Sequence, residues 1–338
     1  MFDIAPIFAK YWVTQNTPLI IACSGGPDSM FLVEQLLQNT KYQIPNTKWG
    51  ENNLEFGIRN LESEKTGNLL VIAHVHHIGF RDESEEDKRF VEKYCDEHAL
   101  FLETMTLDAD EVSKKHKTSP ENACRIERRD FFETLREKYG AKYILTGHHL
   151  DDQIETMMYR LIRGAKIHGL CGIQEREGNY LRPLLGVKKS DILSWLSDNK
   201  IPFCQDSSNE DDTYLRNHIR KNITPEFEKI NPEYHRSFER LSNYFGEMKE
   251  WIDSQFFEIL EDQSFSLTHY WALPNFLQRE LIRAIYESTN DGTIGLSQAN
   301  ISEVQKFIEG KHGNKKKSIG RMHLYKKGGM VTWKRNSY

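Results

Sequence analysis

The stretch from residue 19 to residue 37 constrains the fold of this chain more than any other. Leu19–Cys23 is an apolar run of strand length, and residues 30–37 carry apolar side chains at helical spacing. Between them lies the sequence Ser24-Gly25-Gly26-Pro27-Asp28-Ser29. Two glycines permit turn conformations closed to other residues, so that backbone N–H groups can converge on an anion at the helix N-terminus. We therefore predict a strand, an anion-binding turn and a helix.

Asp28 narrows the kind of anion that this turn could bind. A carboxylate would repel a bare phosphate, so Asp28 fits only if a divalent cation bridges it to phosphate oxygens. The hydroxyl groups of Ser24 and Ser29 can add hydrogen-bond donors. The turn is not the common P-loop, because no Gly-Lys-Ser/Thr ending follows it. An ordinary strand and helix with a capping serine is the alternative interpretation.

The sequence downstream alternates between strand and helix patterns. Runs of strand length occupy residues 69–75, 101–107 and 143–147, and helical patterns occupy residues 83–98, 120–138, 152–163 and 188–199. This alternation predicts an α/β fold, with a parallel sheet covered by helices on both faces. Ligands of such sheets bind beyond the carboxyl ends of the strands. The turn at residues 24–29, the stretch His74-Val75-His76-His77 and residues 147–152 should therefore share one edge.

Beyond about residue 222 the pattern becomes mainly helical. We expect a long charged helix over residues 225–260, broken near Pro232 and Gly246, then helices over residues 274–288 and 297–309. A β-hairpin is expected from residues 318–325 and 330–333. These patterns predict an α/β domain over residues 1–218 and a mainly helical domain over residues 219–338. Residues 40–68 are interpreted as an insertion or long loop without an assigned function.

Composition excludes several classes of protein. No run of about 18 apolar residues occurs, so no membrane span is predicted, and the N-terminal sequence lacks the features of a secretion signal. The five cysteines are scattered and form no Cys-x-x-Cys pair. Their number and spacing favour reduced thiols in a cytoplasmic protein, and argue against a disulfide framework or a structural zinc or iron–sulfur site.

Charge is distributed unevenly along the chain. The formal net charge is −5, yet residues 311–338 contain nine Lys or Arg and no acidic residue. Residues 1–310 therefore hold 36 of the 45 basic residues and all 50 acidic ones, a formal charge of −14. An acidic body with a basic C-terminal segment is typical of a chain that binds an anionic polymer. A solvated basic tail is the alternative.

The stretch His148-His149-Leu150-Asp151-Asp152 places two imidazoles and two carboxylates within five residues. If the aspartates open a helix, the helix dipole stabilises their charge, and His148 would lie near Asp152 across the turn. We predict a site for Mg²⁺ or a substrate amine that faces the anion-binding turn. A transition-metal site, or a capping aspartate beside solvated histidines, are the alternatives.

Several stretches together resemble one family. The turn at residues 24–29 resembles the PP-loop of the N-type ATP pyrophosphatases, an adenine nucleotide alpha hydrolase-like fold. Further stretches match the tRNA(Ile)-lysidine synthetase family: residues 121–129 (ENACRIERR), residues 146–156 (TGHHLDDQIET), Arg182-Pro183-Leu184-Leu185, Asp206-Ser207-Ser208-Asn209, and Arg216-Asn217-His218-Ile219-Arg220. The resemblance is dense over residues 19–220 and loose beyond them. Longer members carry a further domain after the hairpin, so this sequence resembles a form without it.

The resemblance implies a cytoplasmic ATP-dependent ligase. Its reaction attaches L-lysine to C2 of the wobble cytidine 34 of tRNA(Ile) with a CAU anticodon, through an adenylated cytidine, and changes codon reading from AUG to AUA. Implied cofactors are ATP and Mg²⁺; no membrane partner is implied, and a homodimer is compatible. The first domain would be the PP-loop catalytic domain, and the second would bind tRNA.

The resemblance also assigns roles to individual residues. The implied catalytic residues are Asp28, His148 and Asp152, and Mg²⁺ would be bound by Asp28 and Asp152. The implied ATP-binding residues are Ser24, Gly25, Gly26, Pro27, Asp28, Ser29 and His74. The residues implied to contact lysine, cytidine or tRNA are Arg125, Arg128, Arg216, Asn217 and Arg220.

Two departures from the family pattern stand out. The family usually has Asp or Asn where this chain has His76, and Ile78 is an extra residue before the following Gly79-Phe80-Arg81. Cys124 replaces a common alanine, which is a change of packing.

Three other functions are consistent with a PP-loop. A tRNA sulfur transferase would need cysteine pairs or a catalytic cysteine, which the sequence does not suggest. A glutamine- or ammonia-fed synthetase would need no RNA contact, and a nucleotide-sensing or RNA-binding module would bind ATP without releasing pyrophosphate.

Overall fold

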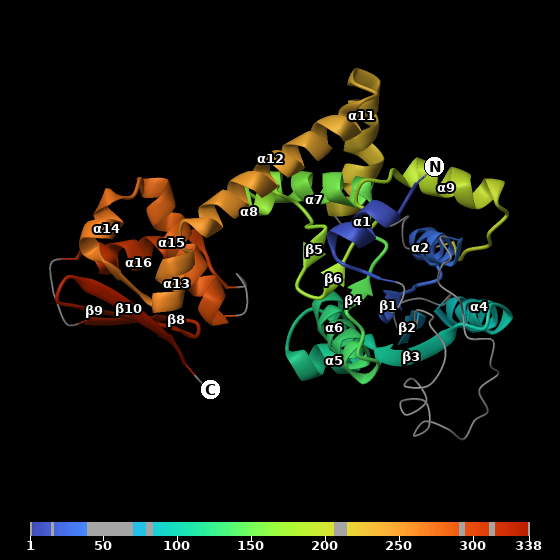
Figure 1. The fold of residues 1–338 in the computed structure, drawn as a ribbon, viewed down its shortest axis with the longest axis horizontal. Coiled ribbons are helices and arrows are strands. Elements are labelled where there is room, and N and C mark those ends of the chain that lie inside the picture. Colours follow the sequence, from blue (N-terminus) through green and yellow to red (C-terminus); the bar gives the residue numbers. More distant parts are fainter. Residues whose placement is uncertain are drawn as a thin grey trace. The chain divides into compact units, whose positions relative to one another are not determined.

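The computed structural model describes residues 2–14, 17–38, 70–78, 84–205, 215–290, 295–310 and 315–336. The chain forms two compact units, Met1–Ser242 and Asn243–Tyr338 (Figure 1). The predicted insertion at residues 40–68, the stretch at residues 79–81 and the family stretch at residues 206–209 lie outside the described residues. Among the described helices, none combines the length and the apolar character that a membrane crossing requires.

The first unit contains a six-stranded sheet with strand order β3-β2-β1-β4-β6-β5. Its strands are β1 (Leu19–Ala22), β2 (Leu70–Ile78), β3 (Phe101–Asp108), β4 (Tyr143–Leu145), β5 (Arg176–Glu177) and β6 (Tyr180–Leu181). All neighbouring pairs are parallel except β5 with β6, which form a short antiparallel ribbon. The predicted α/β fold with a parallel sheet is confirmed.

Helices cover both faces of this sheet. The helices that begin within the first unit, before α12, are α1 (Ala5–Lys10), α2 (Pro27–Gln38), α4 (Ser84–Glu97), α5 (Ala109–His116), α6 (Pro120–Lys138), α7 (Leu150–Ile162), α8 (Ile167–Leu170), α9 (Lys189–Asp198), α10 (Leu215–His218), the π-helix η3 (Ile219–Ile223) and α11 (Thr224–Ile230). Side chains alternate along a strand, so Leu19 and Ile21 pack with α2 and α9 while Ile20 packs with α6. Figure 1 shows α2 and α6 on opposite sides of the strands.

The strand register brings the predicted motifs to one edge of the sheet. Ala22 pairs with Ala73, and Ile21 pairs with Leu145. The chain leaves the sheet after Ala22 and after Leu145, so the turn at residues 24–29 and residues 147–152 share one edge, as the sequence predicted. Residues 74–77 do not end their strand, because β2 continues to Ile78 in register with β3. His74 of β2 contacts the residue that follows β1, since its Nδ1 lies 2.9 Å from the backbone oxygen of Cys23.

The second unit combines helices with a small antiparallel sheet. Helix α12 (Tyr234–Ser254) runs from the first unit into the second, which continues with α13 (Phe257–Asp262), β7 (Ser264–Ser266), α14 (Leu267–Ala272), α15 (Asn275–Asn290), α16 (Gln298–Glu309), β8 (Lys315–Ile319), β9 (Met322–Lys327) and β10 (Met330–Arg335). The strand order is β7-β10-β9-β8. The Ser297 hydroxyl caps α16 by accepting a hydrogen bond from the backbone N–H of Asn300.

The structure corrects three details of the sequence prediction for this region. Residues 318–325 do not form one strand, because the chain turns at Gly320, whose φ is +56°, and divides them between β8 and β9. The long helix breaks near Pro232 but continues through Gly246 within α12. Strand β7 was not predicted, since three residues are too few to show a clear alternation.

The compact units divide after Ser242, later along the chain than the predicted division between residues 218 and 219. Ile219 and Tyr234 are buried against Ile154 and Met158 of α7, so the helices that carry them belong to the packed body of the first unit.

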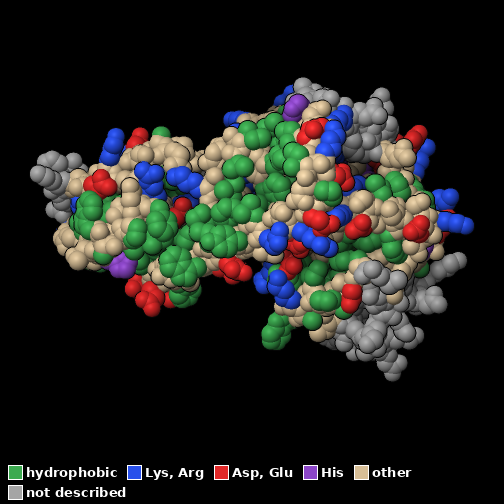
Figure 2. Space-filling model, turned by 90° about the horizontal axis from the view of Figure 1, so that it is seen from above, with side chains coloured by type: hydrophobic (Ala, Val, Ile, Leu, Met, Phe, Trp, Pro, Cys, Tyr) green, Lys and Arg blue, Asp and Glu red, His purple; other side chains and the backbone are tan. Residues whose placement is uncertain are grey.

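On the face drawn in Figure 2, Lys and Arg side chains are interspersed with Asp and Glu, and hydrophobic side chains gather between them.

Candidate functional site

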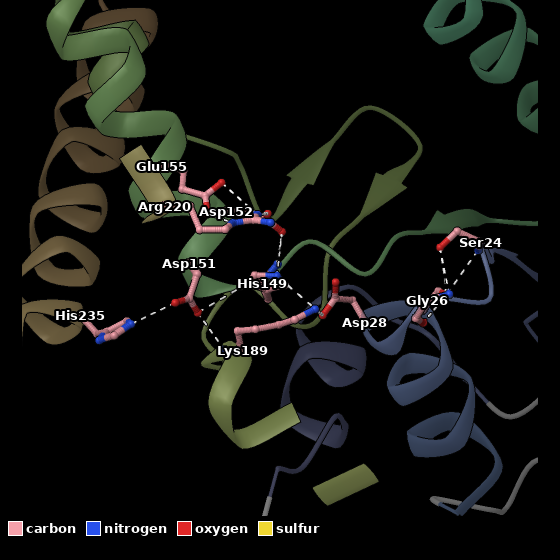
Figure 3. Close-up of polar contacts among 11 residues, drawn as sticks. Ser24, Gly26, Asp28, His149, Asp151, Asp152, Glu155, Lys189, Arg220 and His235 are labelled. Carbon is pink, nitrogen blue, oxygen red and sulfur yellow. Dashed lines mark hydrogen bonds and ion pairs between the residues drawn. The ribbon is translucent and has the colours of Figure 1, made fainter. Parts of the chain in front are cut away.

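The turn between β1 and α2 has a compact, hydrogen-bonded form. Gly25 has a φ of +85°, which favours glycine at that position. The Ser24 hydroxyl accepts a hydrogen bond from the backbone N–H of Gly26 at 3.3 Å, and the Ser29 hydroxyl donates to the backbone oxygen of Gly26 at 2.9 Å. Ser29 is buried, so in this structure its hydroxyl holds the turn in shape. Figure 3 shows the turn at the start of α2, near Asp28.

The second motif touches this turn through the backbone. A Cβ atom placed on Gly147 would lie 3.0 Å from the backbone carbonyl carbon and oxygen of Asp28, tighter than nine in ten real Cβ contacts. Glycine therefore lets the end of β4 approach the start of α2 without moving the Asp28 backbone. The two predicted motifs are therefore adjacent in space as well as at the same edge of the sheet.

His149 lies among three carboxylates. Its Nε2 is 3.6 Å from Asp28 Oδ1 and 3.4 Å from Asp152 Oδ2, and its Nδ1 is 3.6 Å from Asp151 Oδ2. The imidazole is almost fully buried. Burial favours its neutral form, but the contact with Asp151 and the charges of Asp152 and Asp28 outweigh burial and raise its pKa. His149 links the turn to helix α7 through these contacts (Figure 3).

Asp151 orients this imidazole from the other side. Its Oδ2 accepts a hydrogen bond from the backbone N–H of Lys189 at 2.7 Å, and its Oδ1 lies 3.3 Å from Nε2 of His235, on α12. Burial alone would raise the pKa of Asp151, but the hydrogen bonds from His149, Lys189 and His235 reverse that effect and lower it strongly. Asp151 is therefore a fixed anion that ties α7, α9 and α12 together.

Arg220 occupies the opposite end of the cluster. Its guanidinium makes two hydrogen bonds with the buried carboxylate of Glu155, and its Nη2 lies 3.6 Å from Asp152 Oδ1. It is carried by η3, a π-helical segment of the kind that often occurs at functional sites. A cavity of about 140 Å³ opens here. It is lined by His149, Asp151, Ile154, Glu155, Lys189, Arg220, Thr224 and Tyr234.

Lys189 reaches the turn from the first residue of α9. Its Nζ lies 2.6 Å from Asp28 Oδ1, and the two side chains are about equally exposed, at 31% and 30%. Figure 3 shows its side chain extended toward Asp28, close to His149. Among the described residues, Lys189 is the nearest cation to Asp28, for which the sequence analysis predicts Mg²⁺ binding.

The structure brings some of the predicted site residues together. Asp28, Asp152 and Arg220 belong to one cluster, and Arg216 lies beside it, with Nη2 3.3 Å from the Thr156 hydroxyl of α7. Asn217 follows Arg216 on α10. His74 lies on β2 beside the end of β1, with its Nε2 buried and without a hydrogen-bond partner among the described residues.

Other predicted residues lie at the margin of the cluster. His148 is exposed, and its Nδ1 lies 2.8 Å from the Thr146 hydroxyl. Arg125 and Arg128 are exposed on α6, where Arg125 donates to Asn122 at 2.9 Å and Arg128 lies within electrostatic range of His148. The roles assigned to all these residues stay predictions.

Five members of the cluster were not among the predicted site residues. His149 and Asp151 stood in the recognised motif, but adjacent side chains point in different directions, and the sequence does not say which one faces inward. Glu155 also lies in a family stretch. Lys189 and His235 belong to no motif and are placed only by the packing of α9 and α12.

The donor groups of the cluster fit a hard cation shared with a ligand. No group of three or more His, Cys, Asp or Glu side chains that could hold a metal ion occurs within the described part of the chain. Asp28 Oδ1 and Asp152 Oδ2 lie 3.6 Å and 3.4 Å from the same atom, Nε2 of His149, so the two carboxylates face one point. Mg²⁺ is commonly bound by one or two carboxylates together with phosphate oxygens, and these residues fit that mode.

Comparison with known proteins gives a consistent result. A family model described as a PP-loop domain matches residues 3–227. The chain is 32% identical over 252 residues to the tRNA(Ile)-lysidine synthase of Bacillus licheniformis, covering 73% of this chain and 48% of that protein. It is 31% identical over 308 residues to the enzyme of the same name from Bacillus subtilis, covering 87% of this chain and 60% of that protein. The chain thus spans about half to three fifths of the length of these relatives.

A solved structure shares the fold. The U34-tRNA thiolase NcsA from Methanococcus maripaludis superposes with a TM-score of 0.53 at 18% identity, covering 71% of this chain and 77% of that chain. At this level of identity the likeness concerns the fold alone.

Proposed function

We propose, from the premise that this chain belongs to the PP-loop domain family, that it is an ATP-dependent ligase that attaches lysine to C2 of cytidine 34 in tRNA(Ile) with a CAU anticodon. The product, lysidine, would change codon reading from AUG to AUA. The observation that carries the proposal is the meeting of Asp28, Asp152 and Arg220 around one polar cluster. The similarity to tRNA(Ile)-lysidine synthases supports it.

The first step would activate the base. The cytosine O2 attacks the α-phosphorus of ATP, the bond from that phosphorus to the bridging oxygen breaks, and pyrophosphate leaves. The turn at residues 24–29 would hold the leaving pyrophosphate through its backbone N–H groups. Mg²⁺, held by Asp28 and by Asp152, would supply positive charge to the phosphate oxygens when bound.

The second step would replace AMP by lysine. The lysine ε-amine attacks C2 of the adenylated cytidine, the C2–O bond breaks, and AMP leaves. The unperturbed pKa of this amine is about 10.4, so it must first lose a proton to a positioned acceptor. We assign that role to His148 or Asp152, at the N-terminal end of α7. The cavity beside them is lined by Asp151 and Glu155 together with Lys189 and Arg220.

The RNA would be held by basic residues of both units. A single base of a loop can be turned out of its stack into a pocket, which is how proteins usually read RNA loops. Arg125, Arg128 and Arg216 are exposed or half-buried and could contact phosphates near that base. The basic strands of the second unit would contact phosphates elsewhere on the tRNA. We place the reaction in the cytoplasm, where tRNA and ATP are available.

One experiment tests this proposal against its alternatives. The protein is incubated with radiolabelled lysine, ATP and bulk bacterial tRNA that contains the CAU-anticodon tRNA(Ile), and acid-precipitable label is counted. ATP-dependent transfer of label to tRNA is expected. Absence of label with protein that binds ATP would contradict the proposal. ATP binding without pyrophosphate release would indicate a nucleotide-sensing module instead.

A further inference from the structure

We propose that Lys189 is a phosphate-contacting residue of the nucleotide site. In this structure its ammonium group neutralises Asp28; when a divalent cation takes the Asp28 carboxylate, the ammonium group passes to a phosphate oxygen of the nucleotide. The inference rests on the proposed function to the extent that it assumes ATP in the turn at residues 24–29. It assigns this turn a lysine that the turn's own sequence lacks.

The backbone of Lys189 is held firmly, while its side chain can move. The residue begins α9, and its N–H donates to Asp151 Oδ2 at 2.7 Å. From that anchor the side chain extends through four methylene groups to place Nζ 2.6 Å from Asp28 Oδ1. With 31% of the side chain exposed, it is not enclosed by packing. A rotation about its side-chain bonds can therefore redirect the charge without moving the helix.

A divalent cation and Lys189 cannot share the same oxygen of Asp28. Mg²⁺ binds carboxylate oxygens at about 2.0–2.1 Å, and an ammonium group at 2.6 Å from that oxygen would face it across a few ångströms. The site is only partly exposed to water, so the repulsion would be weakly screened. Binding of the cation at Oδ1 must therefore displace the ammonium group.

The neighbouring carboxylates are already engaged. Both oxygens of Asp151 interact with groups of His149, His235 and the Lys189 backbone. Asp152 accepts from the backbone N–H of His149 and faces Arg220. The phosphates that accompany the cation are then the anions best placed to receive the ammonium group. A lysine ammonium is a compact point charge that suits phosphate oxygens.

The test compares Lys189→Met with Lys188→Met. Lys188 is the preceding residue, half-buried like Lys189, and makes no ion pair with a described residue. Two affinities are measured: that of Mn²⁺ alone, from the electron paramagnetic resonance of the free ion, and that of ATP with Mg²⁺, by equilibrium dialysis with radiolabelled ATP. We expect Lys189→Met to bind Mn²⁺ at least threefold more tightly and ATP at least tenfold more weakly. Lys188→Met should match the wild type in both.

The two affinities should change in opposite directions in Lys189→Met, and this separates the proposal from a purely structural role of Lys189. A merely destabilised protein would bind both ligands more weakly, and either that result or unchanged ATP affinity in Lys189→Met would overturn the inference. Lys189→Arg should keep ATP affinity within about threefold of the wild type. If the wild type binds ATP but does not label tRNA with lysine, the proposed function fails, while these two affinities still decide the role of Lys189.

Discussion

Arg220 donates two parallel hydrogen bonds to Glu155, from Nε to Oε1 at 2.6 Å and from Nη2 to Oε2 at 3.1 Å. Only 3% of Glu155 is exposed, whereas 41% of the Arg220 side chain is exposed. Burial raises the pKa of Glu155, and the guanidinium opposes that shift. The pair therefore holds one arginine in a fixed orientation at the edge of the cavity, with its outer face available to a substrate.

Replacing Glu155 by Gln should weaken both this orientation and the fold. The change removes a buried charge that accepts two charge-assisted hydrogen bonds, so we expect the free energy of unfolding to fall by about 1–3 kcal/mol. Urea denaturation measures it. Glu226→Gln is the matched control, because Glu226 pairs with Lys229 on the surface and should contribute less than about 1 kcal/mol. Equal losses in the two variants would contradict the role given to Glu155.

Asp28→Ala and Asp152→Ala should each abolish release of pyrophosphate. Both carboxylates belong to the cluster around His149 and are the oxygen ligands that the proposed adenylation step requires. The measurement is pyrophosphate formed from ATP in the presence of tRNA, with thermal denaturation to confirm that each variant is folded. Asp130→Ala, an exposed change on α6, serves as control. Wild-type release by either site variant would refute the role assigned to that residue.

Glu127 should make stability depend on pH in the acid range. Hydrogen bonds from Lys115 and then His116 lower the pKa of Glu127 below its ordinary value of 4.5. Folding therefore favours the charged form, which stabilises the protein above pH 4.5 and ceases to do so as the pH falls through the lowered pKa. The difference in free energy of unfolding between wild type and Glu127→Gln should be present at pH 7 and shrink below pH 4.5. A difference that grows as the pH falls would contradict this.

Removing the basic charge of the second unit should weaken tRNA binding selectively. Deletion of residues 311–338 is unsuitable, because Met322, Leu324, Val331 and Trp333 are buried. Lys316, Lys327 and Lys334 are exposed instead. Changing all three to Ala should reduce tRNA affinity on the order of tenfold and lower the dependence of log affinity on log salt by about one unit per lost contact. ATP affinity should not change. Unchanged tRNA affinity across several salt concentrations would contradict the prediction.

Local pattern was enough to predict much of the first unit. The strand, turn and helix around residues 19–38 follow from an apolar run, two glycines and helical spacing, all within one short segment. The shared edge of the motifs followed from the rule for parallel sheets. The cluster itself required tertiary information. Its Lys189 is 161 positions from Asp28, and no periodic pattern relates them.

The sequence pattern also could not predict which way each side chain points. His148 and His149 are adjacent and chemically identical, yet one is exposed and the other is buried among carboxylates. The extended backbone of His149, with φ of −123° and ψ of −178° at the N-cap of α7, decides the outcome. That conformation follows from the docking of α7, which depends on residues up to Tyr234.

The close approach of Gly147 to Asp28 has a consequence for how the protein forms. The site is complete only when β4 lies in register beside β1 and when α9 and η3, from still later in the chain, have packed near the turn at residues 24–29. Contacts between residues so far apart in sequence form slowly. A growing chain on the ribosome would therefore have no complete nucleotide site until more than 200 residues had emerged, and capacity to bind ATP would be among the last properties that the first unit acquires.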